Sequence, residues 1–286
     1  MAVLFPGQGS QTEDMGEFAA RLRPDLVAMA VELIGVDPFE HIEEGTRFVQ
    51  PAVFCASLAG WESIKDSQPD YAAGHSLGEL AALVAAGALA TEDGLRLVVA
   101  RGDLCQRCID AAGDSGGMLA VMAARDVAGP LAEEFGLSLA NDNGPTQIVL
   151  SGATAALDAA RRAAADRGVR ALPLAVKGRF HSPAMAPVVP GFRAVLGEIP
   201  FGRPSFPVLS STTAAVFEDI PNTLAEGIVR PVRWSETVGT LHRMGVRRFV
   251  ETGPGTKLGK LLKRSLDGVE VVRRDLLRAE VPGDGS

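Results

Sequence analysis

"DYAAGHSLGELAALVAAGAL", residues 70–89, sets a single serine, Ser76, between a short apolar run and a stretch rich in Ala and Leu. Residues 74–78 fit the pattern G-x-S-x-G, which joins a buried strand to a helix through a sharp turn. The turn exposes the serine hydroxyl, and the amide of Leu77 then points toward an oxyanion formed by attack at that serine. The stretch predicts a nucleophilic serine on an α/β fold. A turn serine that only caps the helix is the alternative.

The order of apolar segments divides the chain into two domains. Residues 1–112 and 178–286 alternate strand and helix candidates and predict an α/β-hydrolase-like large domain. Residues 113–177 run β-α-β-β-α-β, the ferredoxin-like pattern, and predict an inserted small domain. The last residues, 281–286, read VPGDGS and are expected to be disordered.

A nucleophilic serine needs a base, and the chain has only 4 histidines. His75 adjoins Ser76 and is expected to orient the turn, whereas His41 and His242 are expected at the surface. His181 lies where the small domain returns to the large one, and clefts form at such junctions. It is therefore the candidate base, with a hydrogen-bonded loop histidine as the alternative. Acids abound, but none stands in a recognisable triad loop, which leaves a dyad oriented by a backbone carbonyl as an alternative to a triad.

Composition excludes several classes of protein. The net charge of −7 argues against a chain built to neutralise nucleic-acid phosphates. Apolar runs stay shorter than the about 18 residues that a membrane span needs, and the first residues lack the basic region of a signal peptide. Together with only 3 cysteines, this predicts a cytoplasmic protein without a membrane anchor.

Two of the cysteines, Cys105 and Cys108, spell C-Q-R-C. A redox motif or half a zinc site is one interpretation. However, a second cysteine pair is missing from the sequence, and the surroundings are helical in pattern. We therefore expect two small apolar residues on a helix and no metal.

Eight short stretches, including the one around Ser76, occur in a fixed order along the chain. They are FPGQGSQ (5–11), QPAVF (50–54), GHSLGE (74–79), RGDLCQ (101–106), NDNGPTQIVLSG (141–152), FHSPAM (180–185), RPVRW (230–234) and VETGPGTKLGKLLKR (250–264). Together they resemble the malonyl-CoA:acyl carrier protein transacylases and the related acyltransferase domains of polyketide synthases, over nearly the whole chain. The resemblance implies an α/β-hydrolase-like domain with a ferredoxin-like one. It also implies a ping-pong transfer of malonyl from coenzyme A to a carrier phosphopantetheine thiol, without a cofactor.

The resemblance also implies roles for individual residues. Ser76 corresponds to the nucleophile and His181 to its base, while Gln8 and Leu77 correspond to the oxyanion-hole residues through their amides. Arg101 corresponds to the residue that pairs with the malonyl carboxylate, a role that suits a planar guanidinium with two parallel donors.

Four further residues are expected to line the pocket: Gln50, His75, Cys105 and Phe180. Cys105 stands where the family often has Met, which makes the pocket wall smaller. Gly227 stands where many members have Gln or Asn, whose backbone carbonyl orients the histidine. Phe180 beside the base, with Leu77 after the nucleophile, favours malonyl over methylmalonyl.

The implied partner is an acidic acyl carrier protein, and because this chain is acidic too, local basic groups must guide docking. Lys177 with Arg179, and residues 257–264, are the two candidate patches; ordinary solvated basic residues are the alternative. Three other functions stay open: a transacylase for another carrier (such as that of malonate decarboxylase) or acyl unit, a serine esterase, and a scaffold that binds a carrier protein. Intact Ser76, His181 and Arg101 disfavour the scaffold. Fatty-acid and polyketide synthesis are both open.

Overall fold

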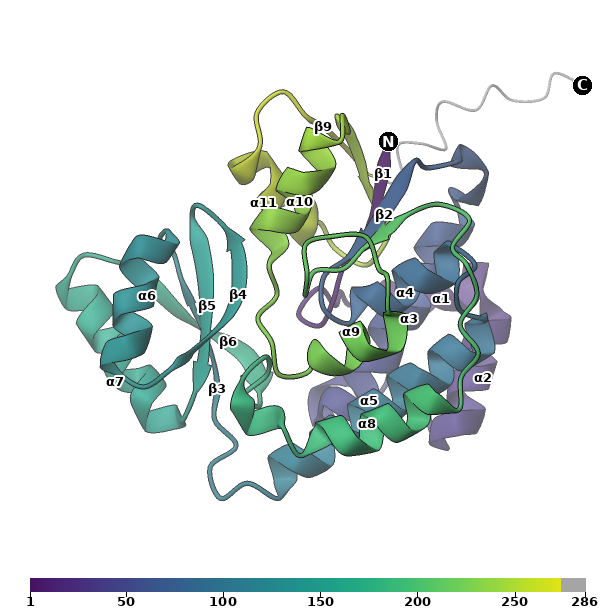
Figure 1. The fold of residues 1–286 in the computed structure, drawn as a ribbon. Coiled ribbons are helices and arrows are strands. Elements are labelled where there is room, and N and C mark those ends of the chain that lie inside the picture. Colours follow the sequence, from purple (N-terminus) through teal and green to yellow (C-terminus); the bar gives the residue numbers. More distant parts are fainter. Residues whose placement is uncertain (274–286) are drawn as a thin grey trace, which may run out of the picture.

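The computed structural model describes residues 1–273, which form two sheets in separate parts of the molecule (Figure 1). The larger sheet is parallel, with the strand order β7-β2-β1-β8-β9. Its strands are β1 (Ala2–Phe5), β2 (Tyr71–Gly74), β7 (Val208–Leu209), β8 (Arg248–Glu251) and β9 (Glu270–Arg273). The central strands β1 and β2 are nearly all buried, as expected for a parallel sheet covered on both faces.

Helices cover both faces of this sheet because residues of β1 alternate between two apolar clusters. Val3 and Phe5 pack toward α3 (Thr46–Glu62), α4 (Gly78–Ala85) and α5 (Thr91–Asp110). Leu4 and Ala2 pack toward α10 (Trp234–Arg243) and α11 (Lys257–Ser265). The remaining elements of this part are α1 (Met15–Leu22), α2 (Pro24–Ile34), α8 (Val188–Gly197), α9 (Ile220–Glu226) and the 3₁₀ turns Ile42–Glu44, Lys65–Ser67 and Pro183–Met185.

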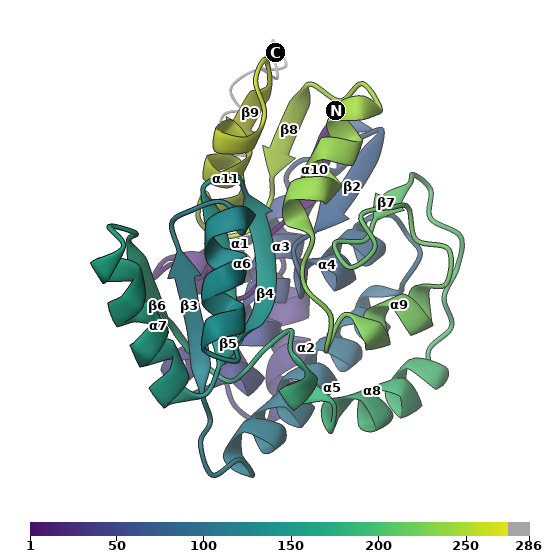
Figure 2. The same cartoon turned by 60° about the vertical axis from the view of Figure 1, so that its left-hand side comes forward.

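The second sheet is antiparallel, with the order β4-β5-β3-β6. Its elements are β3 (Gly117–Val121), α6 (Arg125–Glu134), β4 (Ser138–Gly144), β5 (Gln147–Gly152), α7 (Thr154–Asp166) and β6 (Ala171–Lys177). In Figure 2, α6 and α7 lie on one face of the sheet. The β-α-β-β-α-β order and this strand arrangement are ferredoxin-like, so the predicted fold class is confirmed. We propose residues 113–177 as the extent of the small domain.

The small domain is fastened to the large one along β4. Main-chain bonds of 2.8 Å join Val232 N to the Ala140 carbonyl and Asp142 N to the Val232 carbonyl. The edge strand β4 is thereby paired rather than left open. These bonds hold the side chains of β4 against the end of the large sheet at which β2 meets α4.

No helix within residues 1–273 has the length and apolar character to span a bilayer. The VPGDGS stretch, expected to be disordered, lies outside the described residues.

Candidate active site

The turn between β2 and α4 holds Ser76 in the left-handed region, with φ of 53°. A Cβ on Gly74 would lie 2.1 Å from the amide nitrogen of Glu79, and one on Gly78 would lie 2.0 Å from the carbonyl oxygen of Phe5. Only glycine fits at either position, which explains the pattern G-x-S-x-G physically. The left-handed serine is a strained position of the kind that clusters at active sites.

His181 faces this serine from the segment that follows β6. Its Nε2 lies 2.7 Å from Ser76 Oγ. Its Nδ1 lies 2.9 Å from the carbonyl oxygen of Gly227 and 3.0 Å from that of Arg230. Because carbonyls only accept, Nδ1 carries the proton, and Nε2 presents a lone pair to the serine hydroxyl. The predicted carbonyl of Gly227 therefore does lie against the histidine, and the carbonyl of Arg230, which we did not predict, joins it.

Burial, together with the charge of Arg101 and the neighbouring His75, lowers the pKa of His181 to about 3. The imidazole is thus neutral near pH 7. Within residues 1–273, no carboxylate is hydrogen-bonded to it. A neutral, buried imidazole with its acceptor nitrogen on a hydroxyl is the starting arrangement for general-base catalysis.

Gln8 and Leu77 line the same cavity as Ser76. Gly7 allows their loops to meet, because a Cβ there would lie 2.5 Å from the carbonyl oxygen of His75. Neither amide has a hydrogen-bond partner in the part of the chain that the structure describes. Two unpaired N–H groups beside a nucleophile are what an oxyanion hole requires.

Arg101 enters the site from α5 and is 8% exposed. Its Nη1 donates to Gln50 Oε1 at 2.6 Å, and its Nη2 lies 3.3 Å from Ser76 Oγ. Among the described residues, no carboxylate forms an ion pair with it, and burial lowers its pKa. The nearby charge of Glu79 raises the pKa of Arg101 and offsets part of this burial, but within residues 1–273 no carboxylate is paired directly with the guanidinium. A buried guanidinium without a direct ion pair is costly, and an incoming carboxylate would compensate it.

Gln50 and Cys105 were expected in the pocket wall, and that expectation is wrong. Both side chains are fully buried, and neither lines the cavity around Ser76. Gln50 lies behind Arg101 instead and holds its guanidinium. Helices α3 and α5 pack so closely that these two positions are interior to the domain.

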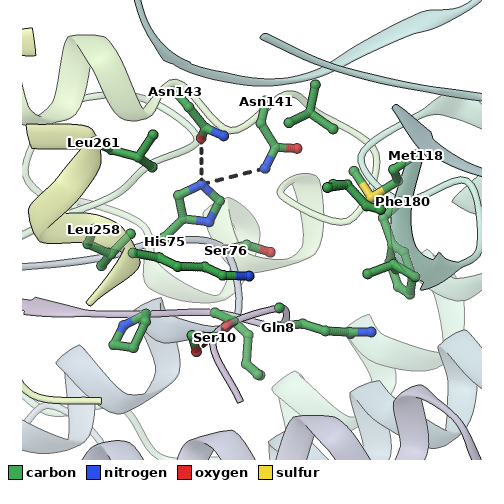
Figure 3. A pocket seen from close by; sticks show the side chains of 18 of the residues that line it. Gln8, Ser10, His75, Ser76, Met118, Asn141, Asn143, Phe180, Leu258 and Leu261 are labelled. Carbon is green, nitrogen blue, oxygen red and sulfur yellow. Dashed lines mark hydrogen bonds between the residues drawn. The ribbon is translucent and has the colours of Figure 1, made fainter. Parts of the chain in front are cut away.

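His75 and Phe180 do line the cavity, on different sides of it (Figure 3). The Nε2 of His75 lies 2.8 Å from Asn143 Oδ1 and 3.5 Å from Asn141 Nδ2, both on β4. Burial lowers the pKa of His75, so the ring is neutral and Nε2–H donates to Asn143. His75, the residue before the candidate nucleophile, is therefore hydrogen-bonded to the small domain.

Sequence reasoning assigned no role to Glu79, which is buried and is connected to the Ser76 amide through Ser211. Its Oε1 accepts from Ser210 Oγ at 2.8 Å and from Ser211 at 2.6 Å (amide) and 3.0 Å (hydroxyl). The hydroxyl of Ser211 in turn accepts from the Ser76 amide at 3.3 Å. Burial raises the pKa of Glu79 to about 7. Its place in the GHSLGE stretch was the only signal of this network.

The cavity that holds these groups measures about 430 Å³ and lies between the two sheets. Met118, Asn141 and Val149 line it from the small domain, and Lys257, Lys260 and Arg264 line it from α11. That helix was one of the two predicted basic patches. In the other patch Lys177 is exposed, whereas Arg179 is bonded to Asp114 at 3.0 Å.

A serine hydroxyl on a neutral histidine, with two unpaired amides and a buried arginine nearby, is the arrangement that acyl transfer through a serine would require. Residues 38–279 match the family model described as the acyl transferase domain, and the chain belongs to that family.

The chain resembles known proteins along nearly its full length. It is 37% identical to the malonyl CoA-acyl carrier protein transacylase of Bacillus subtilis, over 92% of this chain and 90% of that protein. It is 38% identical to the polyketide biosynthesis protein ThaF of Burkholderia thailandensis, over 93% of this chain but only 24% of that protein's length. A solved malonyl-transacylase, in complex with its type II polyketide synthase acyl-carrier protein, aligns with a TM-score of 0.87. It is 33% identical, over 95% of this chain and 94% of that one.

Proposed function

We propose that the protein transfers a malonyl group from malonyl-CoA, through an acyl-enzyme on Ser76, to the phosphopantetheine thiol of an acyl carrier protein. The observation that carries the proposal is Arg101. It is buried, forms no ion pair or hydrogen bond with a carboxylate among residues 1–273, and its Nη2 lies 3.3 Å from Ser76 Oγ. A site for a neutral acyl group gains nothing from such a cation, whereas a malonyl carboxylate neutralises it.

The first half-reaction begins with transfer of the Ser76 proton to His181 Nε2 as Oγ attacks the thioester carbonyl. The amides of Gln8 and Leu77 stabilise the oxyanion. The intermediate collapses, the carbon–sulfur bond breaks, and the protonated His181 gives its proton to the coenzyme A thiolate. The carbonyls of Gly227 and Arg230 keep the ring oriented while it carries the positive charge.

The second half-reaction reverses these steps with a new thiol. His181 takes the proton of the carrier's phosphopantetheine thiol, and the thiolate attacks the malonyl ester of Ser76. Collapse returns the proton to Ser76 Oγ and releases malonyl-carrier protein. All proton transfers use side chains of this protein, and we propose that no cofactor is needed.

The carrier protein is acidic, and we propose that it approaches along α11. Lys257, Lys260 and Arg264 line the cavity on this helix, beside Leu258 and Leu261. The relative solved with its acyl-carrier protein supports a partner of this kind. We propose a cytoplasmic location, and a role in fatty-acid or polyketide synthesis.

Two other functions share the same serine and histidine. A transacylase for another carrier or acyl unit would use Arg101 in the same way if that unit bears a carboxylate. An esterase would hydrolyse the Ser76 ester and would need no buried arginine.

Mass spectrometry of the intact protein separates these functions. We expect malonyl-CoA to give an adduct on Ser76 that persists in water and disappears when a holo acyl carrier protein is added. Acetyl-CoA and methylmalonyl-CoA should load less, and Ser76→Ala should give no adduct. Rapid loss of the adduct to water would favour the esterase, and an adduct on another residue would contradict the assignment of Ser76.

A further inference from the structure

A chain of hydrogen bonds joins Arg101 to Gln8, which both line the cavity, through two residues that do not line it. Arg101 Nη1 donates to Gln50 Oε1 at 2.6 Å, and Gln50 Nε2 donates to Thr46 Oγ1 at 2.8 Å. The hydroxyl of Thr46 then donates to Gln8 Oε1 at 2.8 Å. One threonine thus connects the candidate carboxylate-binding group with the candidate oxyanion-hole loop.

The direction of this chain is fixed by its first member. A guanidinium can only donate, so the oxygen of Gln50 must face Arg101 and its amide nitrogen must face Thr46. The Thr46 oxygen therefore accepts from Gln50, and its single proton is left for Gln8. Hydrogen bonds in such a chain polarise one another, and a cation at its start strengthens this effect.

Thr46 itself is held rigidly. It is the first residue of α3 and is 4% exposed, and its amide donates to Gln106 Oε1 on α5 at 3.0 Å. The preceding residue, Gly45, has a φ of 149°, which favours glycine, and a Cβ there would displace the Gln106 oxygen from 2.2 Å away. The hydroxyl of Thr46 is therefore a fixed anchor point in the domain interior.

The loop of Gln8 needs such an anchor. Gln8 lies between Gly7 and Gly9, and Gly9 has a φ of 96°. Glycines on both sides leave the backbone many alternative conformations. The bond from Thr46 restrains the Gln8 side chain and with it the direction of the Gln8 amide. Oxyanion stabilisation depends on such preorganised donors.

We propose that Thr46 is a positioning residue that couples the two halves of substrate recognition. Through Gln50 it orients Arg101 for the acyl carboxylate, and through Gln8 it orients an oxyanion-hole amide. The inference rests on the proposed function. It goes beyond that function because it assigns to one buried hydroxyl both the preference for an acidic acyl group and part of the rate.

The test compares Thr46→Val, which keeps the shape but removes the hydroxyl, with Thr46→Ser, which keeps the hydroxyl. Single-turnover loading of Ser76 is measured with malonyl-CoA and with acetyl-CoA. In Thr46→Val we expect acetyl loading to fall about tenfold, as the Gln8 amide loses its restraint. Malonyl loading should fall about 100-fold, because Arg101 also loses its orientation. Thr46→Ser should restore both rates to within about threefold of the parent.

Thr91→Val is the matched control, because Thr91 is also the first residue of a helix, α5, outside this hydrogen-bond chain. It should leave both rates unchanged. The inference is overturned if Thr46→Val lowers the malonyl and acetyl loading rates by the same factor, lowers only the malonyl loading rate, or leaves both rates unchanged. It is also overturned if Thr46→Ser is as slow as Thr46→Val. Failure of the parent enzyme to load malonyl at all would instead refute the proposed function.

Discussion

The Nδ1 of His181 lies 2.9 Å from the carbonyl oxygen of Gly227, at the C-terminal end of α9. A carbonyl orients the imidazole as a triad carboxylate does, but it carries no charge and does not titrate. The base therefore lacks the negative neighbour that normally raises the pKa of a catalytic histidine. Its protonation behaviour depends on burial and on Arg101.

This arrangement predicts a pH profile for malonyl loading. Since the pKa of His181 lies near 3, the base stays unprotonated throughout the range from pH 5 to 8. Single-turnover loading should show no inflection that belongs to this histidine in that range. Glu79, with a pKa near 7, titrates there, so the profile is measured in parallel with Glu79→Gln. An inflection near pH 6.5 that survives in Glu79→Gln would contradict the assignment.

Gly227 offers a second prediction, because its side-chain space is filled. A Cβ there would lie 2.8 Å from Thr212 Oγ1, closer than side chains tolerate. Gly227→Ala should therefore displace the end of α9 and its carbonyl, and should slow loading by about ten- to 100-fold. The φ of −58° at Gly227 is helical, so backbone strain is not the cause.

The double variant Gly227→Ala with Thr212→Ala tests this steric explanation. Removing the Thr212 hydroxyl makes room for the new methyl group, and loading should return most of the way to the parent rate. Thr212→Ala alone should load normally. If the double variant is as slow as Gly227→Ala, crowding against Thr212 is not the reason.

The residues around the nucleophile could be predicted because their chemistry depends on local sequence. The turn at Ser76 needs glycine on both sides, and this requirement is visible as a short pattern. The pairing of Ser76 with His181 spans 105 positions and followed from the scarcity of histidines and from the domain junction. The carbonyl of Gly227 followed from the family resemblance.

The side chains behind these groups could not be predicted in the same way. Gln50 and Cys105 were placed in the pocket wall because they stand in family stretches, but the packing of α3 against α5 buries both. Thr46 reads as an ordinary helix start. Its role depends on a Gln8 side chain 38 positions away, and no local pattern records such a contact.

The raised pKa of Glu79 predicts how the free energy of unfolding changes with pH. Its pKa is about 7 in the folded protein, against an ordinary value of 4.5, so between these values the folded state binds more protons than the unfolded state. Stability should therefore fall as pH rises from 4.5 to 7, by at most about 1.4 kcal/mol per pH unit. His181 acts oppositely, since its folded pKa of about 3 lies below its ordinary 6.5. Its contribution rises with pH between those values.

The difference between the parent and Glu79→Gln isolates the first effect, because His181 is common to both proteins. The glutamine oxygen can still accept from Ser210 and Ser211, so the network keeps its donors. Urea unfolding from pH 4.5 to 8 should show Glu79→Gln gaining stability relative to the parent as pH rises. A constant difference between the two proteins would mean that Glu79 does not titrate in this range.

The buried position of Arg101 beside Ser76 predicts that the enzyme prefers an acyl group with a carboxylate. Arg101→Ala removes the partner of the malonyl carboxylate, and malonyl loading should fall by about 100- to 1000-fold, as for loss of a buried charged hydrogen bond. The same change removes a positive charge that lowers the pKa of His181, so the histidine becomes a stronger base. Acetyl loading should therefore fall much less than malonyl loading, and the ratio of malonyl to acetyl should drop.

Arg96→Ala is the matched control on the same helix. Its side chain is 64% exposed, its Nη1 lies 3.6 Å from Asp93 Oδ1, and it does not line the cavity around Ser76. Intact-protein mass spectrometry after brief exposure to an equimolar mixture of malonyl-CoA and acetyl-CoA gives the ratio directly. We expect Arg96→Ala to keep the parent ratio, and Arg101→Lys to recover little of it, because an ammonium cannot hold both Gln50 and a carboxylate in the guanidinium geometry. An unchanged ratio in Arg101→Ala would remove this residue from carboxylate recognition, and with it the observation on which malonyl as substrate rests.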